Sequence, residues 1–433
     1  YLKIKKKFGF ELTNDQKKAI EEINNDLKSN QKMFRLLQGD VGSGKTIVAL
    51  IASANVISSG FQVCLMAPTE ILAKQHYALA NKLFDENINI KILTSKTEFK
   101  ERKNILRDLD NNKINILIGT QSLFQEKIKY RNLGLVIIDE QHKFGVKQRK
   151  KLSDKGGKNC DVLVMSATPI PRTMIMTIFG DMDTSIIKNK PKNRIEIKTY
   201  SKLASKTEEV INFVKRQISQ RNQVFWVCPL IEESKKVDHQ SSVKRYEHLQ
   251  KIFKNKVGLL HGALSKEDKN NILLNFLNKK IDILVSTTVI EVGIDFPSAN
   301  IIIIENANKF GLSQLHQLRG RVGRGDKESY CILMFKSNLS QNAKKRINII
   351  KKTTDGFKIS EEDMRLRGYG DLLGFKQSGL QSFRLADPVL NEDLFILAEK
   401  EVKRIEEQED QDFKKYMTLL KLYDRADILN DIV

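Results

Sequence analysis

Short apolar runs rich in β-branched residues alternate with amphipathic helical stretches along most of the 433-residue chain, and this alternation limits the possible folds most strongly. Between about residues 34 and 200 the runs are FRLLQ, QVCLMA, INILIG, LGLVIIDE and DVLVMS. A second series contains QVFWVCPL, VGLLH, IDILVSTT and ANIIIIE. Apolar strands separated by helices are typical of a parallel sheet covered by helices. The pattern therefore predicts an α/β fold with two parallel-sheet domains in tandem.

The stretch NKPKNRIEIKTY interrupts the alternation, which indicates a linker near residues 186–197. Past Phe335 the apolar strands stop, and helical segments flank a glycine-containing loop, RLRGYGDLLGFKQSG. We therefore expect a first domain over residues 1–188, a second over 189–345, and a small, mainly helical module over 346–433.

The formal net charge of +21 favours a polyanionic partner, because clustered Lys and Arg side chains release counterions when they bind phosphates. The chain is also rich in Lys, Ile and Asn, a bias that codon composition can produce, so charge alone leaves both interpretations open. The chain starts with Tyr rather than Met and its motifs begin almost at once, which indicates a piece of a longer protein.

Targeting signals and cysteine spacing point to the cytoplasm. No apolar run approaches the roughly 18 residues of a membrane span, and YLKIKKKFGF lacks the apolar segment of a signal peptide. The four cysteines are far apart and no two form a CxxC pair. This distribution favours buried, reduced thiols over a disulfide framework or a zinc site.

Residues 39–46 read GDVGSGKT, a complete match to the phosphate-binding pattern G-x-x-x-x-G-K-[ST]. The match follows the run FRLLQ and precedes the helical stretch TIVALIASANVI, as the motif requires. Backbone N–H groups would surround the phosphates, Lys45 would reach the β- and γ-phosphates, and the Thr46 hydroxyl would hold Mg²⁺. Upstream, the Gln16 amide is either an adenine contact or a solvated helix residue. The predicted cofactors are ATP and Mg²⁺, and the candidate nucleotide-binding residues are Gln16, Gly39, Asp40, Val41, Gly42, Ser43, Gly44, Lys45 and Thr46.

The run LGLVIIDEQH ends in two carboxylates at the carboxyl edge of a buried strand, where α/β sheets place ligands. Asp139 would hold Mg²⁺ directly or through water, and Glu140 would position or deprotonate the attacking water. A surface acidic pair is the alternative, although such a pair seldom ends an apolar run. The next run is MSATPIPRT. In it, the hydroxyls of Ser166 and Thr168 could pass a change at the γ-phosphate on to Gln141 and His142.

The segment QLHQLRGRVGRG in the second domain carries two arginines that suit an arginine-finger role. A guanidinium reaching across an interdomain cleft can stabilise charge on the transferring phosphoryl group, whereas a generic basic patch is the alternative. The candidate catalytic residues are Lys45, Asp139, Glu140, Gln141, His142, Gln317, Arg321 and Arg324, and the candidate metal ligands are Thr46 and Asp139.

Three segments, APTEILAKQH, GTQSLF and STTVIEVGIDFP, each follow an apolar strand and present small or hydroxyl residues. Backbone N–H groups in such segments can bind phosphates without reading bases. The candidate DNA contacts are Pro68, Thr69, Gly119, Thr120, Gln121, Ser166, Thr168, His261, Thr287 and Thr288.

In this order the motifs resemble the helicase core and C-terminal portion of the RecG family of superfamily 2 DNA helicases. The strings that carry the resemblance are GDVGSGKT, APTEILAKQH, IDEQHKFGV, SATPIPRT, STTVIEVGIDFP and KFGLSQLHQLRGRVGRG. The transcription-repair coupling factor is the second candidate family. It ranks below RecG because its acidic box reads DEEH and its phosphate loop has Phe where this sequence has Ser43. The primosomal helicase has a clustered-cysteine zinc insert that this sequence lacks.

The resemblance implies two RecA-like domains and an ATP-dependent helicase or duplex translocase. Its expected role is to remodel stalled replication forks and Holliday junctions in DNA repair and recombination. Duplex and branched DNA are the expected partners, single-stranded DNA-binding protein is a further candidate, and a cytoplasmic monomer without membrane contact is expected. An RNA helicase and a nucleic-acid-binding scaffold with an inactive nucleotide site are the alternatives.

By the same resemblance, residues 366–379 correspond to a translocation motif that couples ATP-driven closure to movement on duplex DNA. The residues carried over to this role are Arg365, Arg367, Lys376 and Gln377. Family members usually have Arg where Lys376 stands and a basic residue where Ala263 stands. The N-terminal wedge domain that splits the branch point in the family is absent from this sequence.

Overall fold

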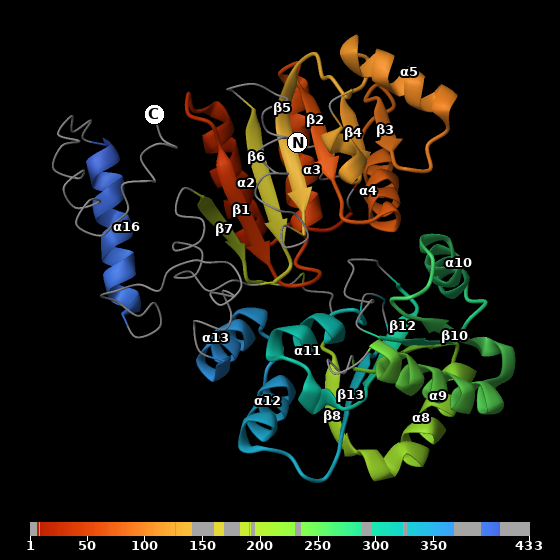
Figure 1. Ribbon diagram of the computed structural model, residues 1–433. Coiled ribbons are helices and arrows are strands. Elements are labelled where there is room, and N and C mark those ends of the chain that lie inside the picture. Colours follow the sequence, from red (N-terminus) through yellow and green to blue (C-terminus); the bar gives the residue numbers. More distant parts are fainter. Residues whose placement is uncertain are drawn as a thin grey trace. The chain divides into compact units, whose positions relative to one another are not determined.

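A computed structural model describes residues 7, 9–125, 127–140, 160–168, 182–189, 191, 195–229, 235–287, 296–323, 325, 327–367 and 391–407 (Figure 1). The contacts divide the chain into two compact units. The first unit comprises residues 1–171 and 181–366 and contains both sheets described below. The second unit comprises residues 172–180 and 367–433.

The first sheet consists, among the described residues, of seven parallel strands in the order β3-β4-β2-β5-β6-β1-β7. The strands are β1 (Phe34–Gly39), β2 (Gln62–Met66), β3 (Ile90–Leu93), β4 (Ile116–Gly119), β5 (Leu133–Asp139), β6 (Asp161–Ser166) and β7 (Asp183–Ile187). β5, β6 and β1 are neighbours, with Asp139 paired to Met165 and Gln38 paired to Ser166. The carboxyl ends of these three strands therefore meet at one edge of the sheet.

Helices connect the strands of the first sheet. They are α2 (Asn14–Lys28), α3 (Lys45–Ser58), α4 (Glu70–Leu83) and α5 (Phe99–Asp110), with a 3₁₀ turn η1 (Gln121–Phe124). α3 is apolar over most of its surface and is largely buried, because it packs in the core of this sheet. α2 begins at Thr13, which forms a capping box with Gln16.

The second sheet has six described strands, also parallel, in the order β10-β11-β9-β12-β13-β8. They are β8 (Lys198–Leu203), β9 (Gln223–Val227), β10 (Val257–Leu260), β11 (Ile283–Ser286), β12 (Ala299–Ile304) and β13 (Tyr330–Phe335). The helices are α8 (Thr207–Ser219), α9 (Lys235–Phe253), α10 (Lys266–Leu277) and α11 (Leu312–Arg319), with short turns η3 (Ala204–Lys206), η4 (Lys254–Lys256) and η6 (Ala307–Lys309). The predicted α/β class with two parallel sheets is thus confirmed.

β13, which lies between β12 and β8, is outside the predicted apolar series, and the other three strands outside it, β3, β7 and β8, all lie at an edge of their sheet. Their residues are only partly buried, because an edge strand has a neighbour on one side alone. A search for apolar runs therefore misses these three edges, although it finds β10, which also lies at an edge. The predicted end of the strands at Phe335 matches the last residue of β13.

Two helices follow β13, α12 (Gln341–Lys352) and α13 (Gly356–Arg367). Ile347 and Ile350 of α12 and Ile359 of α13 are buried in the core of the second sheet. The predicted boundary between residues 345 and 346 therefore falls inside α12. The described part of the second unit contains α16 (Glu392–Glu407).

All four cysteines are buried and free of disulfide bonds, as the sequence indicated. Among the described residues, no helix combines the length and the apolar character that a membrane span requires.

Candidate nucleotide-binding and hydrolysis site

The phosphate loop joins the end of β1 at Gly39 to the start of α3 at Lys45. Gly42 and Gly44 have φ angles of 76° and 88°, in the left-handed region where glycine is favoured. A Cβ atom on Gly44 would overlap the side-chain amide of Gln16. The loop thus needs glycine for its backbone conformation and for close packing, and it leads into the N-terminus of α3, where free backbone N–H groups can bind an anion.

The Lys45 ammonium lies inside this loop. Its Nζ donates to the carbonyl oxygens of Gly39 at 2.6 Å and Asp40 at 3.1 Å, and the side chain is buried. Thr46 follows in the first turn of α3 and is half-buried. Because a phosphate oxygen would attract the ammonium more strongly than a carbonyl does, this arrangement suits exchange of the two carbonyl contacts for a polyphosphate. Of the remaining loop residues, Asp40, Val41 and Ser43 are buried and Gly42 is exposed.

Gln16 supports the phosphate loop from outside. Its Nε2 donates to the carbonyl of Ser43 at 2.8 Å, and its Oε1 accepts from the backbone N–H of Thr13 at 2.9 Å. The side chain is only 2% exposed, which rules out the solvated helix residue that was one reading of the sequence. The adenine contact stays a prediction, and each polar atom of the amide already has one protein partner.

Asp139 and Glu140 stand where β5 ends, and both are buried. Asp139 Oδ2 accepts from the ring Nε2 of His76 at 2.8 Å. Burial and the neighbouring Asp139 charge raise the pKa of Glu140, whereas the positive charges of Lys45 and Arg321 oppose this shift. Glu140 also has a φ of 56°, a conformation rare outside glycine and often found at functional sites.

Ser166, at the end of β6, lies between the loop and the acidic pair in the sheet, since Gln38 of β1 is its register partner. Its hydroxyl donates to the Thr168 carbonyl at 3.0 Å and lies 3.0 Å from the Thr168 hydroxyl. The backbone N–H of Ala167 donates to the Glu140 carboxylate and helps to hold its charge. The segment after β6 therefore touches the proposed base directly.

α11 brings cationic and small residues of the second sheet to the same site. Arg321 is 2% exposed and is close enough to Glu140 to lower the pKa of that carboxyl. A Cβ on Gly320 would lie 3.0 Å from the Cβ of Val41, so α11 ends against the phosphate loop. Gln317 is half-buried on this helix. The structure thus brings together Lys45, Glu140 and Arg321 from segments far apart in the sequence.

Sequence reasoning missed three buried polar residues near this site. His76 was quoted inside APTEILAKQH and His316 and Arg319 inside QLHQLRGRVGRG, but no role was given to them. His316 donates from Nε2 to Asp40 Oδ1 at 2.6 Å. The available signal was helical spacing, because His76 is four residues from both Leu72 and Ala80 on the buried face of α4.

The predicted phosphodiester-gripping segments lie at the carboxyl ends of β2, β4 and β11. The Thr69 hydroxyl caps α4 by accepting from the N–H of Leu72 at 3.3 Å. Gly119 is required by packing, since a Cβ there would overlap the carbonyl of Leu93. Thr287 is 2% exposed. Half-buried positions in the same set are Pro68, Thr120 and His261. Each DNA contact stays a prediction.

The other predicted coupling residues are only partly described. Arg365 is exposed on α13 and pairs with Glu362 at 3.2 Å, and Ala263 is exposed in a turn after β10. Arg367 is the last residue of α13. The predicted residues that lie outside the described part, or whose side chains do, are Gln121, Gln141, His142, Thr288, Arg324, Arg367, Lys376 and Gln377.

Three family models match the chain in succession. Residues 13–177 match the DEAD/DEAH box helicase model and residues 205–326 match the helicase conserved C-terminal domain. Residues 353–424 match the C-terminal part of domain 3 of the ATP-dependent DNA helicase RecG. The last match distinguishes RecG from helicases that share only the two sheet domains.

Curated relatives and solved structures agree with this assignment. The chain is 48% identical over 404 residues to ATP-dependent DNA helicase RecG of Thermotoga maritima, covering 93% of this chain and 52% of the relative. It is 48% identical over 387 residues to the Bacillus subtilis RecG, covering 89% of this chain and 56% of the relative. A structure of RecG bound to a three-way DNA junction matches with a TM-score of 0.76 and 46% identity, over 89% of this chain and 50% of that chain.

A more distant match, the DEAD-box helicase Mss116 bound to ssRNA, has a TM-score of 0.58 at 18% identity, over 87% of this chain and 93% of that chain, and shows the shared fold alone. The chain spans about half the length of the curated relatives it matches. Over that span, the phosphate loop, the acidic pair, Arg321 after α11 and the domain 3 match make this chain a member of the RecG family of ATP-dependent DNA helicases.

Proposed function

We propose that this chain is an ATP-hydrolysing motor that moves along duplex DNA and remodels branched DNA, such as stalled forks and Holliday junctions, in repair and recombination. The observation that carries the proposal is the environment of Glu140. The positive charges of Lys45, in the phosphate loop, and of Arg321, in the second sheet domain, both act on this buried carboxylate and oppose the rise in its pKa. An ATPase site shared between two sheets is what nucleotide-driven movement requires.

In this proposal the triphosphate occupies the phosphate loop and draws the Lys45 ammonium away from the Gly39 and Asp40 carbonyls. Mg²⁺ would be held by the Thr46 hydroxyl and by Asp139, directly or through water. The described residues contain no group of three or more His, Cys, Asp or Glu side chains that could hold a metal by themselves. A magnesium ion completed by phosphate oxygens and water fits such a sparse donor set.

Glu140 then positions or deprotonates the attacking water, and Arg321 stabilises charge on the γ-phosphoryl group. Arg324, Gln141, His142 and Gln317 are proposed to complete this set. In comparable enzymes an arginine finger accelerates turnover about 10³- to 10⁵-fold. Withdrawal of the arginine after hydrolysis would loosen the contact between the two sheets, which is the step that turns chemistry into movement.

Duplex and branched DNA are the proposed substrates. The net charge of +21 favours a polyanion, and a RecG structure was solved with a three-way DNA junction. Residues 366–379 are proposed to grip the duplex, within a C-terminal module over 346–433 that follows domains over 1–188 and 189–345. We further propose a cytoplasmic monomer, with single-stranded DNA-binding protein as a candidate partner.

The test is phosphate release by the purified chain, measured alone and with linear duplex, single-stranded DNA, a synthetic fork or RNA. We expect duplex or fork DNA to stimulate turnover most, and Glu140→Gln to abolish it. Glu21→Gln is the matched control, because Glu21 is exposed on α2 and far along the chain from the acidic pair. Turnover that persists in Glu140→Gln would remove Glu140 from its proposed role.

Stimulation by RNA and by no DNA would replace the substrate assignment with an RNA helicase. Nucleotide binding without hydrolysis on any nucleic acid would favour the scaffold with an inactive site. If a fork stimulates phosphate release no more than linear duplexes with the sequences of its arms, the proposed activity would be limited to movement along duplex DNA.

A further inference from the structure

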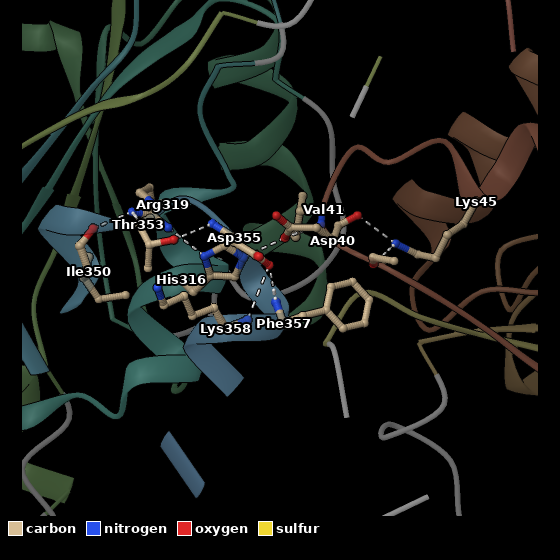
Figure 2. Close-up of polar contacts among 11 residues, drawn as sticks. Asp40, Val41, Lys45, His316, Arg319, Ile350, Thr353, Asp355, Phe357 and Lys358 are labelled. Carbon is tan, nitrogen blue, oxygen red and sulfur yellow. Dashed lines mark hydrogen bonds and ion pairs between the residues drawn. The ribbon is translucent and has the colours of Figure 1, made fainter. Parts of the chain in front are cut away.

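A buried line of hydrogen bonds leads from the phosphate loop to the end of α12 (Figure 2). Asp40 Oδ1 accepts from His316 Nε2 at 2.6 Å, and His316 Nδ1 lies 2.8 Å from Arg319 Nη2. Arg319 Nη1 then donates to the carbonyls of Ile350 at 2.6 Å and Thr353 at 2.9 Å. Three side chains therefore span the distance between the nucleotide site and the α12–α13 turn.

The direction of each bond in this line is fixed. A guanidinium has only donors and does not lose its proton in proteins, so His316 Nδ1 must accept from Arg319. The proton of the neutral ring then resides on Nε2, which donates to Asp40. His316 thus contacts Asp40 through Nε2 and Arg319 through Nδ1, and neither ring nitrogen can make the contact of the other.

Burial makes the line respond as a unit. Asp40, His316 and Arg319 are 3%, 5% and 2% exposed, so water cannot replace a lost partner at low cost. A cavity of about 280 Å³ lies beside them, lined in part by Asp40, His316, Arg319 and Glu196. The cavity leaves room for the side chains to rearrange, while Gly320 packs closely on Val41 next to them.

The far end of the line is a structured turn. Asp355 Oδ1 accepts from the N–H groups of Phe357 at 2.9 Å and Lys358 at 3.3 Å, which caps the start of α13. α13 returns to α11, because Asp363 accepts from the N–H of Ser313 at 3.1 Å and from its hydroxyl at 2.6 Å. α11 is therefore hydrogen-bonded to α12 at its C-terminal end and to α13 at its N-terminal end.

We propose that His316 is a positioning residue that conveys the state of the phosphate loop to the α12–α13 turn, through Asp40 on one side and Arg319 on the other. When a triphosphate draws Lys45 off the Asp40 carbonyl, the Asp40 carboxylate meets a new polyanion and its bond to His316 must change. The turn is followed by α13, which ends where the segment proposed to grip DNA begins. The inference rests on the proposed function and names the contact that would couple its two halves.

Two conservative variants separate the two atoms of the ring. Gln places an amide where Nε2 stands, so His316→Gln keeps a donor for Asp40 and loses the acceptor for Arg319. Asn places its amide near Nδ1, so His316→Asn keeps an acceptor for Arg319 and loses the contact with Asp40. The exposed His248 supplies the matched control His248→Asn. Asp40→Ala removes the acceptor from the loop side should either His316 variant fail to fold.

The first measurement is hydrogen exchange at the backbone N–H groups of Asp355, Phe357 and Lys358, with and without AMP-PNP and Mg²⁺. In the unmodified chain we expect the nucleotide to change exchange in this turn, and in both His316 variants we expect no change. This readout needs nucleotide binding but no hydrolysis, so it decides the relay even where the proposed ATPase fails. No nucleotide response in the unmodified chain overturns the proposal.

The second measurement is the ratio of kcat for ATP with and without duplex DNA. We expect this ratio to fall about 10- to 100-fold in both variants, while the KM for ATP changes much less. A purely local role in the loop would spare His316→Gln, and a purely structural role beside Arg319 would spare His316→Asn. Either result contradicts a relay, because a relay needs both contacts. DNA-stimulated turnover that stays normal in both variants leaves the proposed motor intact and removes the coupling role of His316.

Discussion

Two buried histidine–aspartate pairs flank the candidate site, and they differ in which parts of the chain they join. His76 bonds Asp139 at 2.8 Å and His316 bonds Asp40 at 2.6 Å, with each histidine 5% exposed. The first pair links α4 to β5 within the first sheet domain. The second pair links α11, which lies between β12 and β13 of the second sheet in the chain, to the loop after β1 of the first.

The same kind of contact can therefore have two different roles in one molecule. The His76 pair is positioned by the pairing of β2 with β5, since α4 follows β2, and both of its residues belong to the first sheet domain. It suits orientation of a carboxylate that is proposed to hold Mg²⁺. The His316 pair exists only while α11 stands at the loop, so it suits communication. The expectations below test whether the two pairs separate in this way.

The largest effect is expected for Arg321, the cation that α11 brings to Glu140. Arg321→Ala should lower kcat about 10³- to 10⁵-fold, because an arginine finger acts mainly on the transition state. Binding of AMP-PNP should change far less. Single-turnover phosphate release is the measurement, with Arg216→Ala on the exposed face of α8 as control. A loss of less than threefold would exclude the second sheet from the chemistry.

A smaller effect is expected for His76. His76→Ala leaves the buried Asp139 carboxylate without its donor, and kcat should fall about 10- to 100-fold. His76→Gln should recover much of this loss, because its amide can reach the same oxygen. Steady-state ATP hydrolysis is the measurement. The fold-decrease in kcat should be equal with and without DNA. A decrease seen only in the DNA-stimulated rate would show that the two pairs do not differ in role.

Gly320 offers a steric test of the contact across the loop. Its φ of −66° suits any residue, so Gly320→Ala should leave the backbone unstrained. The added Cβ would press on Val41 at 3.0 Å, and we expect the KM for ATP to rise about threefold to tenfold. Gly262→Ala is the control, because a Cβ there meets nothing within 4 Å. Equal KM values for the two variants would show that α11 does not press on the loop.

The smallest effect concerns stability. The pKa of Glu140 is raised in the folded chain, so the folded state favours the protonated acid more than the unfolded state does. Its stabilising contribution is complete below the ordinary Glu pKa and is lost as the pH rises through the raised value. Glu140→Gln should therefore unfold at a somewhat higher temperature than the unmodified chain at pH 7.

The two proteins should converge towards pH 4, where both side chains are neutral. Thermal unfolding followed by circular dichroism across pH 4 to 8 supplies the measurement. A difference that grows in acid would reverse the sign assigned to Glu140.

The sequence predicted the site best where the functional residues lie close together in the chain. GDVGSGKT has a fixed spacing and a strand and helix on its flanks, so it indicated the loop and the role of Lys45 directly. The acidic pair was equally visible because a buried strand ends at Asp139. Most strands were found by their apolar runs, and β8 escaped because it lies at an edge of its sheet and half of its residues are exposed.

The histidine pairs escaped for a different reason. Helical spacing places His316 and Arg319 on one buried face of α11, but it does not name their partners. Asp40 is separated from His316 by 276 residues, and only the packing of α11 on the loop brings them together. Gln16 was a partial success, since its capping role follows from the Thr13 spacing whereas its contact with Ser43 needed the fold.

The measurement that most directly tests the central claim is a double-mutant cycle between Asp40 and His316. It requires Asp40→Ala, His316→Ala and the double variant, each assayed for kcat/KM of ATP hydrolysis with duplex DNA. If the contact across the loop couples the two sheets, the interaction energy should be at least about 1.4 kcal/mol, a tenfold departure from additivity. Additive single effects, within about 0.5 kcal/mol, would contradict the account.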